Sequence, residues 1–106
     1  MTTIQQQTFD TLTYMGYDRA YVTDGVGTPS FTMEAANSHE RALVASLAQE
    51  HTWGHDYMMS IMEQARNKGI NTIVLVACSR QVMELFDAYN FHALYPELTF
   101  TWLIFK

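Results

Sequence analysis

The spacing of apolar residues at the start of the chain predicts a short helix over residues 5–15. Phe9, Leu12 and Met15 recur at intervals of three, which places them on one helical face. Gly16 follows directly, and glycine commonly ends helices because it adopts backbone angles that other residues avoid.

The residues after this helix predict a β-hairpin. Residues 19–23 favour a strand because they include Tyr21 and Val22, and residues 24–30 hold the glycines and proline of a turn. Residues 31–33 would then form the returning strand of the hairpin.

The pattern over residues 34–52 leaves two structures open. The apolar residues within 43–47 fit a helix that begins near Ser38. Residues 42–48 fit a short buried strand equally well. The apolar run is too short for periodicity to decide between them.

The second half of the chain has a clearer pattern. Five apolar residues share one helical face ahead of Gly69, which is placed to cap that helix: Tyr57, Met58, Ile61, Met62 and Ala65. Residues 72–77 lack polar alternation, which is typical of a central strand covered on both faces. Ser79 is a good N-cap for the next amphipathic helix, which carries Val82, Met83, Phe86 and Tyr89. Residues 99–105 predict a closing strand.

This alternation predicts an α/β fold, with a mixed sheet and crossover helices. If residues 42–48 form a strand, it would pair parallel to residues 72–77 through a right-handed crossover. The length of 106 residues corresponds to a single domain, residues 1–106.

Composition narrows the class of protein. Hydrophobic residues make up 48% and charged residues 16%, so the chain is globular; the low charge and many aromatics predict a homodimer. The net charge of −5 makes a nucleic-acid partner unexpected. A single cysteine, no signal-like N-terminus and no long apolar run predict a cytoplasmic protein that does not bind membranes.

The stretch Glu-His-Thr-Trp-Gly-His-Asp at residues 50–56 is the first candidate for a functional site. It precedes a predicted helix, whose first backbone N–H groups are free to hold a phosphate. The simpler interpretation is an ordinary connection in which Gly54 makes a turn. Trp53 beside that glycine would stack on a ligand, anchor an interface or pack internally.

Residues 53–77 run Trp-Gly-His-Asp-Tyr-Met-Met-Ser-Ile-Met-Glu-Gln-Ala-Arg-Asn-Lys-Gly-Ile-Asn-Thr-Ile-Val-Leu-Val-Ala, and Val-Met-Glu-Leu-Phe follows at 82–86. With Asn-Phe at 90–91 and the closing strand, this half of the chain resembles a GNAT-family N-acetyltransferase. In that family a loop of the type Gln/Arg-x-x-Gly-x-Gly/Ala caps a helix and binds the pyrophosphate of acetyl-CoA.

The resemblance implies residues for cofactor binding and for catalysis. The acyl-CoA would lie along the helix start, on Trp53, Gly54, His55, Asp56 and Tyr57. Glu50 or His51 would deprotonate the attacking amine. His51 stands where the family has Gln or Arg, and Asp56 stands where it has Gly or Ala and would repel a pyrophosphate. The family's tyrosine proton donor falls on Phe86. The resemblance therefore implies an acetyltransferase-like fold that lacks full activity.

The same region is also similar to a STAS domain of the anti-anti-sigma-factor type, which is a non-catalytic interaction module. Ser79, Val82, Leu85 and Phe86 fit its Ser-x-x-Val-x-x-Leu-Phe pattern. The STAS motif Asp-Ser-Ser-Gly aligns with residues 51–54, where only Thr52 could accept a phosphate. That layout also requires a helix and a strand between Phe31 and His51. An oligomeric scaffold without a ligand is the third alternative.

A pair of histidines and the single cysteine are weaker candidates for a functional site. His51 and His55 are four residues apart, as metal ligands on a helix can be, but no strong spacing signature accompanies them and no metal site is predicted. Cys78 precedes a predicted helix, where a thiol can become reactive, although a small buried hydrophobic residue is the commoner case.

Overall fold

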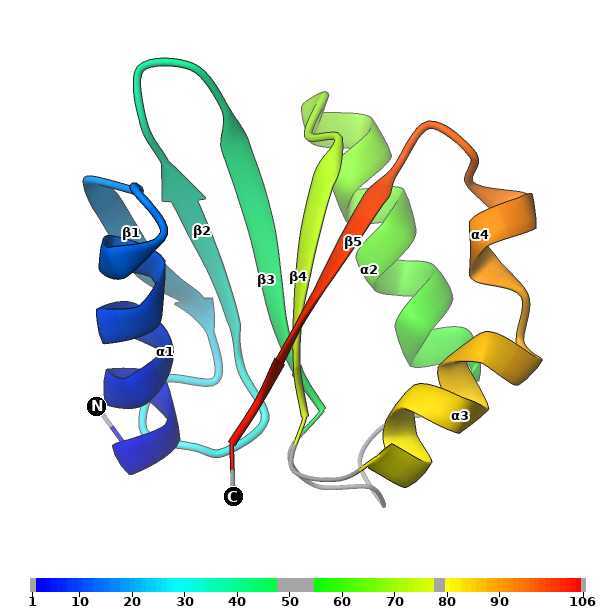
Figure 1. The fold of residues 1–106 in the computed structure, drawn as a ribbon, viewed down its shortest axis with the longest axis horizontal. Coiled ribbons are helices and arrows are strands. Elements are labelled where there is room, and N and C mark those ends of the chain that lie inside the picture. Colours follow the sequence, from blue (N-terminus) through cyan, green and yellow to red (C-terminus); the bar gives the residue numbers. More distant parts are fainter. Residues whose placement is uncertain (1, 48–54, 78–79, 106) are drawn as a thin grey trace.

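The computed structural model describes residues 2–47, 55–77 and 80–105. Its helices and strands are, in chain order, α1 (Thr3–Tyr14), β1 (Arg19–Asp24), β2 (Thr32–Ala36), β3 (Arg41–Leu47), α2 (His55–Lys68), β4 (Thr72–Ala77), α3 (Arg80–Ala88), α4 (Phe91–Leu94) and β5 (Thr99–Ile104) (Figure 1). The predicted α/β class with a mixed sheet is confirmed.

The five strands form one sheet in the order β1-β2-β3-β4-β5. β1, β2 and β3 pair antiparallel, whereas β3, β4 and β5 run parallel. The segment whose structure the sequence left open is a strand, β3, and its register with β4 aligns Val44 with Val74. Residues 42–46 are buried, because this strand lies between two others and is covered on both faces.

Strand β4 is the interior strand that its composition predicts. Residues 73–77 are almost completely buried, and neighbouring strands pair with both edges of β4. Alternate side chains of this strand enter two different cores, because successive residues of a strand point to opposite faces.

One core lies beneath α1. It contains Leu12, Tyr17, Phe31, Met33, Ala35, Ala42, Val44, Val74 and Val76. The other core lies beneath α2, α3 and α4. Its buried residues include Leu43, Ala45, Met58, Ile61, Met62, Ala65, Ile73, Leu75, Phe86 and Phe91. The sheet therefore separates α1 from the other helices, and Figure 1 shows them on opposite sides.

Helix α1 is fixed to the first hairpin by the buried side chain of Gln5. Gln5 completes a capping box with Thr2, and its Nε2 donates to the backbone oxygens of Gly25 (2.9 Å) and Thr28 (2.8 Å). Gly25 has a φ of +76°, and an added Cβ would collide with the backbone oxygen of Ser30. This turn requires glycine for both reasons.

Helix α2 buries the face that its sequence predicts. Met58, Ile61, Met62 and Ala65 have no more than 1% of their surface exposed. The helix ends before Gly69, whose φ of +69° suits a C-terminal cap.

The C-terminal end of α2 is attached to the sheet by charged side chains. The carboxylate of Glu34, on β2, is nearly buried and accepts hydrogen bonds from Lys68 (2.7 Å) and Arg41 (2.9 Å). Arg41 also donates to the backbone oxygen of Lys68 at 3.2 Å. The hydrogen bond from Lys68 is the main reason that the pKa of Glu34 is lowered, and Arg41 adds to it against the opposing effect of burial.

Among residues 2–47, 55–77 and 80–105, no helix combines the length and apolar character needed to cross a bilayer.

Replacing Ile61 by Ala tests the buried face of α2. The change should lower the free energy of unfolding by about 2–5 kcal/mol, because it leaves a cavity in the core. Asn67→Ala is the matched control on the exposed face of the same helix, and it should stay within about 0.5 kcal/mol of the natural protein. Chemical denaturation measures both, and equal losses would contradict the assignment of the two faces.

Replacing Glu34 by Gln tests the attachment of α2 to the sheet. At pH 7 the variant should lose about 1–3 kcal/mol, because two charged donors lose their carboxylate partner. The pKa of Glu34 is lower in the folded than in the unfolded protein, so its stabilising effect is present above the unfolded value and is lost as pH falls through the folded value. Denaturation curves of the two proteins should therefore converge at acidic pH, and a difference that persists there would exclude an ionic origin.

Candidate functional site

The carboxyl ends of three parallel strands, β3, β4 and β5, define one edge of the sheet, and α2 begins there. In α/β sheets with parallel strands, ligands bind outside the carboxyl ends of the strands, where helix N-termini favour anions. The candidate catalytic residues Glu50 and His51 lie outside the described residues. Trp53, Gly54, Cys78 and Ser79 also lie outside them.

His55, the first residue of α2, packs against aromatic side chains of the helices beside it. Its ring stacks on Phe91 with centroids 5.6 Å apart and meets the edge of Tyr89 at 5.2 Å. Its Nδ1 lies 3.7 Å from an Asp56 carboxylate oxygen. Of the predicted cofactor-binding residues, His55 thus has a packing role between α2 and the α3–α4 region.

Asp56 is fully exposed in the first turn of α2. A carboxylate at this position complements the partial positive charge of the helix N-terminus. An incoming anion would compete with that carboxylate for the same N–H groups. The structure therefore places the predicted repulsive charge directly in the first helical turn.

Tyr57 is half-buried, and the charge of a carboxylate that is distant in sequence affects the pKa of its hydroxyl. Burial raises the pKa of its hydroxyl, and the charge of Asp24 raises it further. Asp24 ends β1, which runs in the same direction as β3 and so ends at the same edge. A tyrosine hydroxyl can donate a hydrogen bond, and the raised pKa makes the Tyr57 hydroxyl a weaker acid than an ordinary tyrosine.

This electrostatic effect of Asp24 on Tyr57 could not be predicted from the sequence. Two strands, β2 and β3, lie between these residues in the chain, and only the antiparallel arrangement of β1, β2 and β3 brings the end of β1 to the same edge as the start of α2. The local signal was limited to an aspartate before the glycine-rich turn.

The position of the acetyltransferase family's tyrosine is part of the core. Phe86 is completely buried, and its ring lies 5.1 Å from Phe100, 5.2 Å from Phe91 and 5.3 Å from Trp102. A residue at this position cannot reach a ligand at the surface in this arrangement. Any proton donor would have to come from elsewhere.

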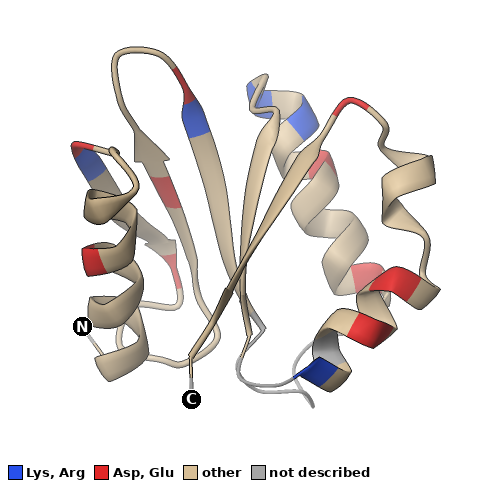
Figure 2. Cartoon of the chain, in the orientation of Figure 1, with Lys and Arg blue, Asp and Glu red and all other residues tan. Residues whose placement is uncertain are grey.

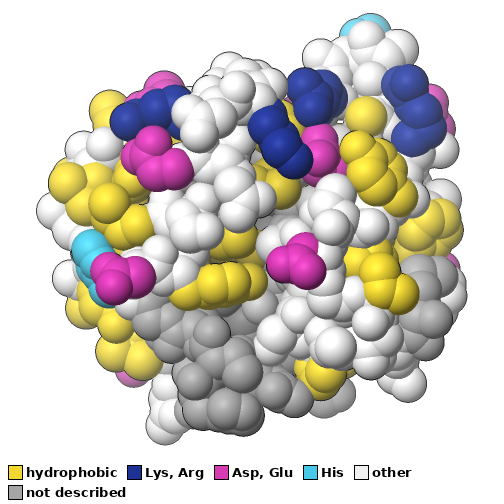
Figure 3. All heavy atoms as spheres, turned by 180° about the vertical axis from the view of Figure 1, so that it is seen from behind, with side chains coloured by type: hydrophobic (Ala, Val, Ile, Leu, Met, Phe, Trp, Pro, Cys, Tyr) yellow, Lys and Arg dark blue, Asp and Glu magenta, His cyan; other side chains and the backbone are white. Residues whose placement is uncertain are grey.

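Charged side chains are distributed unevenly between the two ends of the parallel strands. Near the carboxyl ends, the acidic residues are Asp24, Asp56, Glu84 and Asp87, and Arg80 is the described cation beside them. At the other end, Arg41, Arg66 and Lys68 gather along one rim beside acidic side chains (Figures 2 and 3). The candidate edge is thus acidic, which favours cationic molecules over anionic ones.

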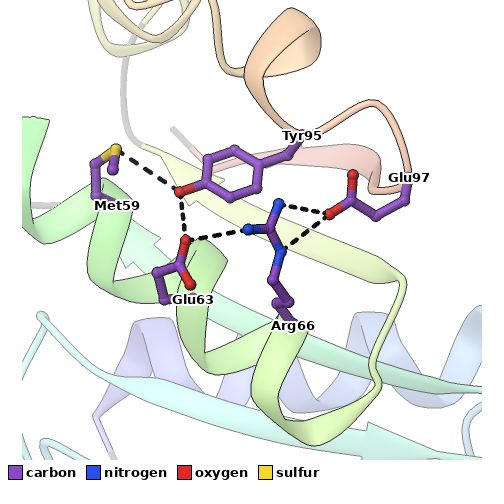
Figure 4. Close-up of polar contacts among 5 residues, drawn as sticks. All are labelled: Met59, Glu63, Arg66, Tyr95 and Glu97. Carbon is purple, nitrogen blue, oxygen red and sulfur yellow. Dashed lines mark hydrogen bonds and ion pairs between the residues drawn. The ribbon is translucent and has the colours of Figure 1, made fainter.

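Arg66, one of the cations at the far end, takes part in contacts that hold α2 against the segment leading to β5 (Figure 4). Arg66 pairs with Glu97 at 2.9 Å, and its guanidinium lies 4.8 Å from the ring centre of Tyr95. The Tyr95 hydroxyl donates to Glu63 at 2.9 Å and contacts the Met59 sulfur at 3.7 Å. This cluster has a structural role.

Two surface hollows that are lined by described residues lie away from the start of α2. One, of about 490 Å³, is lined by polar residues of 37–41 and 69–72 at the amino end of β4. Another, of about 390 Å³, lies between α3 and β5 and is lined by Arg80, Met83, Glu84, Asp87 and Ile104. The histidine, cysteine, aspartate and glutamate side chains that the structure describes include no group of three suited to a metal ion.

Comparisons of the chain with protein-family models, with curated proteins and with solved structures find no match.

Replacing Tyr95 by Phe tests the cluster at the far end of α2. Loss of the buried hydroxyl should lower the free energy of unfolding by about 0.5–1.5 kcal/mol, the usual contribution of one hydrogen bond. Tyr14→Phe removes the hydroxyl of a tyrosine that is 93% exposed and should have no measurable effect. If the two variants were equally stable, the contact between Tyr95 and Glu63 would have no stabilising role.

Proposed function

We propose that this protein is an acyl-CoA-binding, N-acetyltransferase-like protein in which acetyl transfer is weak or absent. The observation that supports this function is the β3–α2–β4 unit. Its parallel strands place the N-terminus of α2 at the carboxyl edge of the sheet, and the residues that resemble an acyl-CoA loop occur at this point of the sequence.

The residues at this edge suggest how the ligand would be held. The first backbone N–H groups of α2, around Tyr57, would bind the pyrophosphate, since helix N-termini leave such groups free. Bound acetyl-CoA would supply a thioester-activated acetyl group. Glu50 or His51 would accept the proton of the attacking amine, as the family resemblance implies. The Tyr57 hydroxyl would supply a hydrogen-bond donor, which Phe86 lacks.

The charge at the edge explains why activity would be weak. Asp56 occupies the first turn of α2, and Asp24 and Glu84 are further carboxylates at this edge. Like charges raise the free energy of a bound pyrophosphate, while the same carboxylates would attract a protonated amine. The natural protein should therefore bind acetyl-CoA weakly or not at all.

A STAS-type interaction module is the alternative, and the segment before α2 gives it less support. That layout places a helix and a strand between Phe31 and His51. The described part of this segment instead holds two antiparallel strands, β2 and β3. A module of that type, or an oligomeric scaffold, would have no affinity for acyl-CoA.

Replacing Asp56 by Gly is the experiment that tests the proposal. The variant should bind acetyl-CoA more tightly than the natural protein in a calorimetric titration. The reason is that removing one carboxylate at a helix N-terminus favours a bound anion by about 0.3–1 kcal/mol for a surface interaction. In the alternatives, the change would only lower stability, by about 0.5–2 kcal/mol.

Two controls make the result specific. Asp56→Asn removes the charge without introducing glycine, so it should reproduce the gain in affinity if electrostatics cause it. Asp10→Asn removes the same charge from the exposed surface of α1 and should leave affinity unchanged. No binding by a folded Asp56→Gly variant would leave the proposed function without support. Tight binding by the natural protein would show that Asp56 is a smaller obstacle than its charge suggests.

A further inference from the structure

Strand β5 forms one edge of the sheet, and its backbone presents unpaired groups on the outer side. Within the described residues, β5 pairs only with β4. The backbone N–H of Thr99 donates to the backbone oxygen of Asn71 at 2.8 Å. The backbone N–H of Phe105 donates to the backbone oxygen of Ala77 at 3.1 Å. N–H groups alternate between the two sides of a strand, so those of the odd-numbered residues point toward β4. The N–H and C=O groups of Phe100, Trp102 and Ile104 therefore point outward.

The side chains of β5 do not protect this edge. Residues 98–105 contain no charged residue and no proline, and the side chains of Phe100 and Trp102 are only partly buried. Proteins usually block exposed edges with charges, prolines or bulges, because a bare edge pairs with other strands. The opposite edge, β1, has such protection: Arg19 and Asp24 flank it, and its register shifts between Val22 and Asp24.

We propose that β5 pairs antiparallel with β5 of a second copy of this chain across a two-fold axis, so that the five strands of each copy join into one continuous sheet. A two-fold axis perpendicular to the sheet places residues of the same face opposite each other. Centring that axis on Trp102 aligns Trp102 with its own counterpart and Phe100 with Ile104 of the second copy. This register pairs every outward-pointing residue of β5 with another outward-pointing residue.

The chemistry of the edge favours a second copy as the occupant. Symmetric pairing brings each strand against an identical one, so a charge near the centre would face the same charge. Residues 98–105 avoid this, and the preceding Glu97 is already neutralised by Arg66 at 2.9 Å. The hollow of about 390 Å³ between α3 and β5 is lined by Ile104 and Met83, so the surface beside Ile104 is open to a second copy.

The position of Ile104 allows the pairing to be removed without breaking the sheet. Its N–H points outward, so Ile104→Pro deletes a donor of the proposed interface and no hydrogen bond to β4. Proline is tolerated on edge strands for this reason. Ile104→Thr is the matched control, because it removes apolar surface but keeps the N–H and a β-branched side chain.

Sedimentation of the natural chain and the two variants measures the association. The natural chain and Ile104→Thr should be dimers at high micromolar concentration. Ile104→Pro should be a folded monomer, with a dissociation constant raised at least about tenfold. A monomeric natural chain would overturn the proposal, and so would a dimer that Ile104→Pro leaves intact.

Amide hydrogen exchange identifies the interface directly. In the dimer, the amides of Phe100 and Trp102 should exchange slowly, and they should exchange fast in Ile104→Pro. The amides of Thr101 and Leu103, which point toward β4, should remain slow in both proteins and report that the sheet is intact. Fast exchange at Phe100 and Trp102 in a dimeric natural chain would place the interface elsewhere and refute the inference.

Discussion

Strand β4 must be covered on both faces, because the side chains of Thr72–Ala77 are apolar with only a threonine at the start. Apolar surface on each face contributes roughly 25 cal/mol per Å² when it is removed from water. A helix layer on each side meets this requirement, with α1 on one face and α2, α3 and α4 on the other. The two cores and the parallel neighbours of β4 are consequences of this one constraint.

The position of α2 follows from the same constraint and determines where a ligand could bind. The helix buries its apolar face against β3 and β4, and Glu34 holds its C-terminal end through Lys68 and Arg41. With that end fixed among cations and carboxylates, the N-terminus lies at the carboxyl edge of the strands. The helix dipole there favours an anion, while Asp56 and Asp24 oppose one. The balance between these two effects decides the strength of any acyl-CoA site.

The two edge strands of the sheet, β1 and β5, differ in the features that would block pairing with a further strand. β1 carries charged residues and a register shift, and α1 is fixed beside it through Gln5. β5 has aromatic and β-branched residues on both faces and packs against α3 and α4, and no other described strand pairs with its outer backbone groups. One edge is thus closed to further pairing and the other is open to it.

The sequence by itself determined the elements with strong local signals. The apolar run of β4, the amphipathic pattern of α2 and its cap at Gly69 all form where they were predicted, because each depends on residues close together in the chain. Tertiary structure decided the rest. Residues 42–47 form a strand because it pairs with strands that are distant in sequence and is buried between them. The local spacing of apolar residues does not reveal such partners. The electrostatic effect of Asp24 on Tyr57 and the difference between the two sheet edges also depend on the order of the strands, which only the packed sheet fixes.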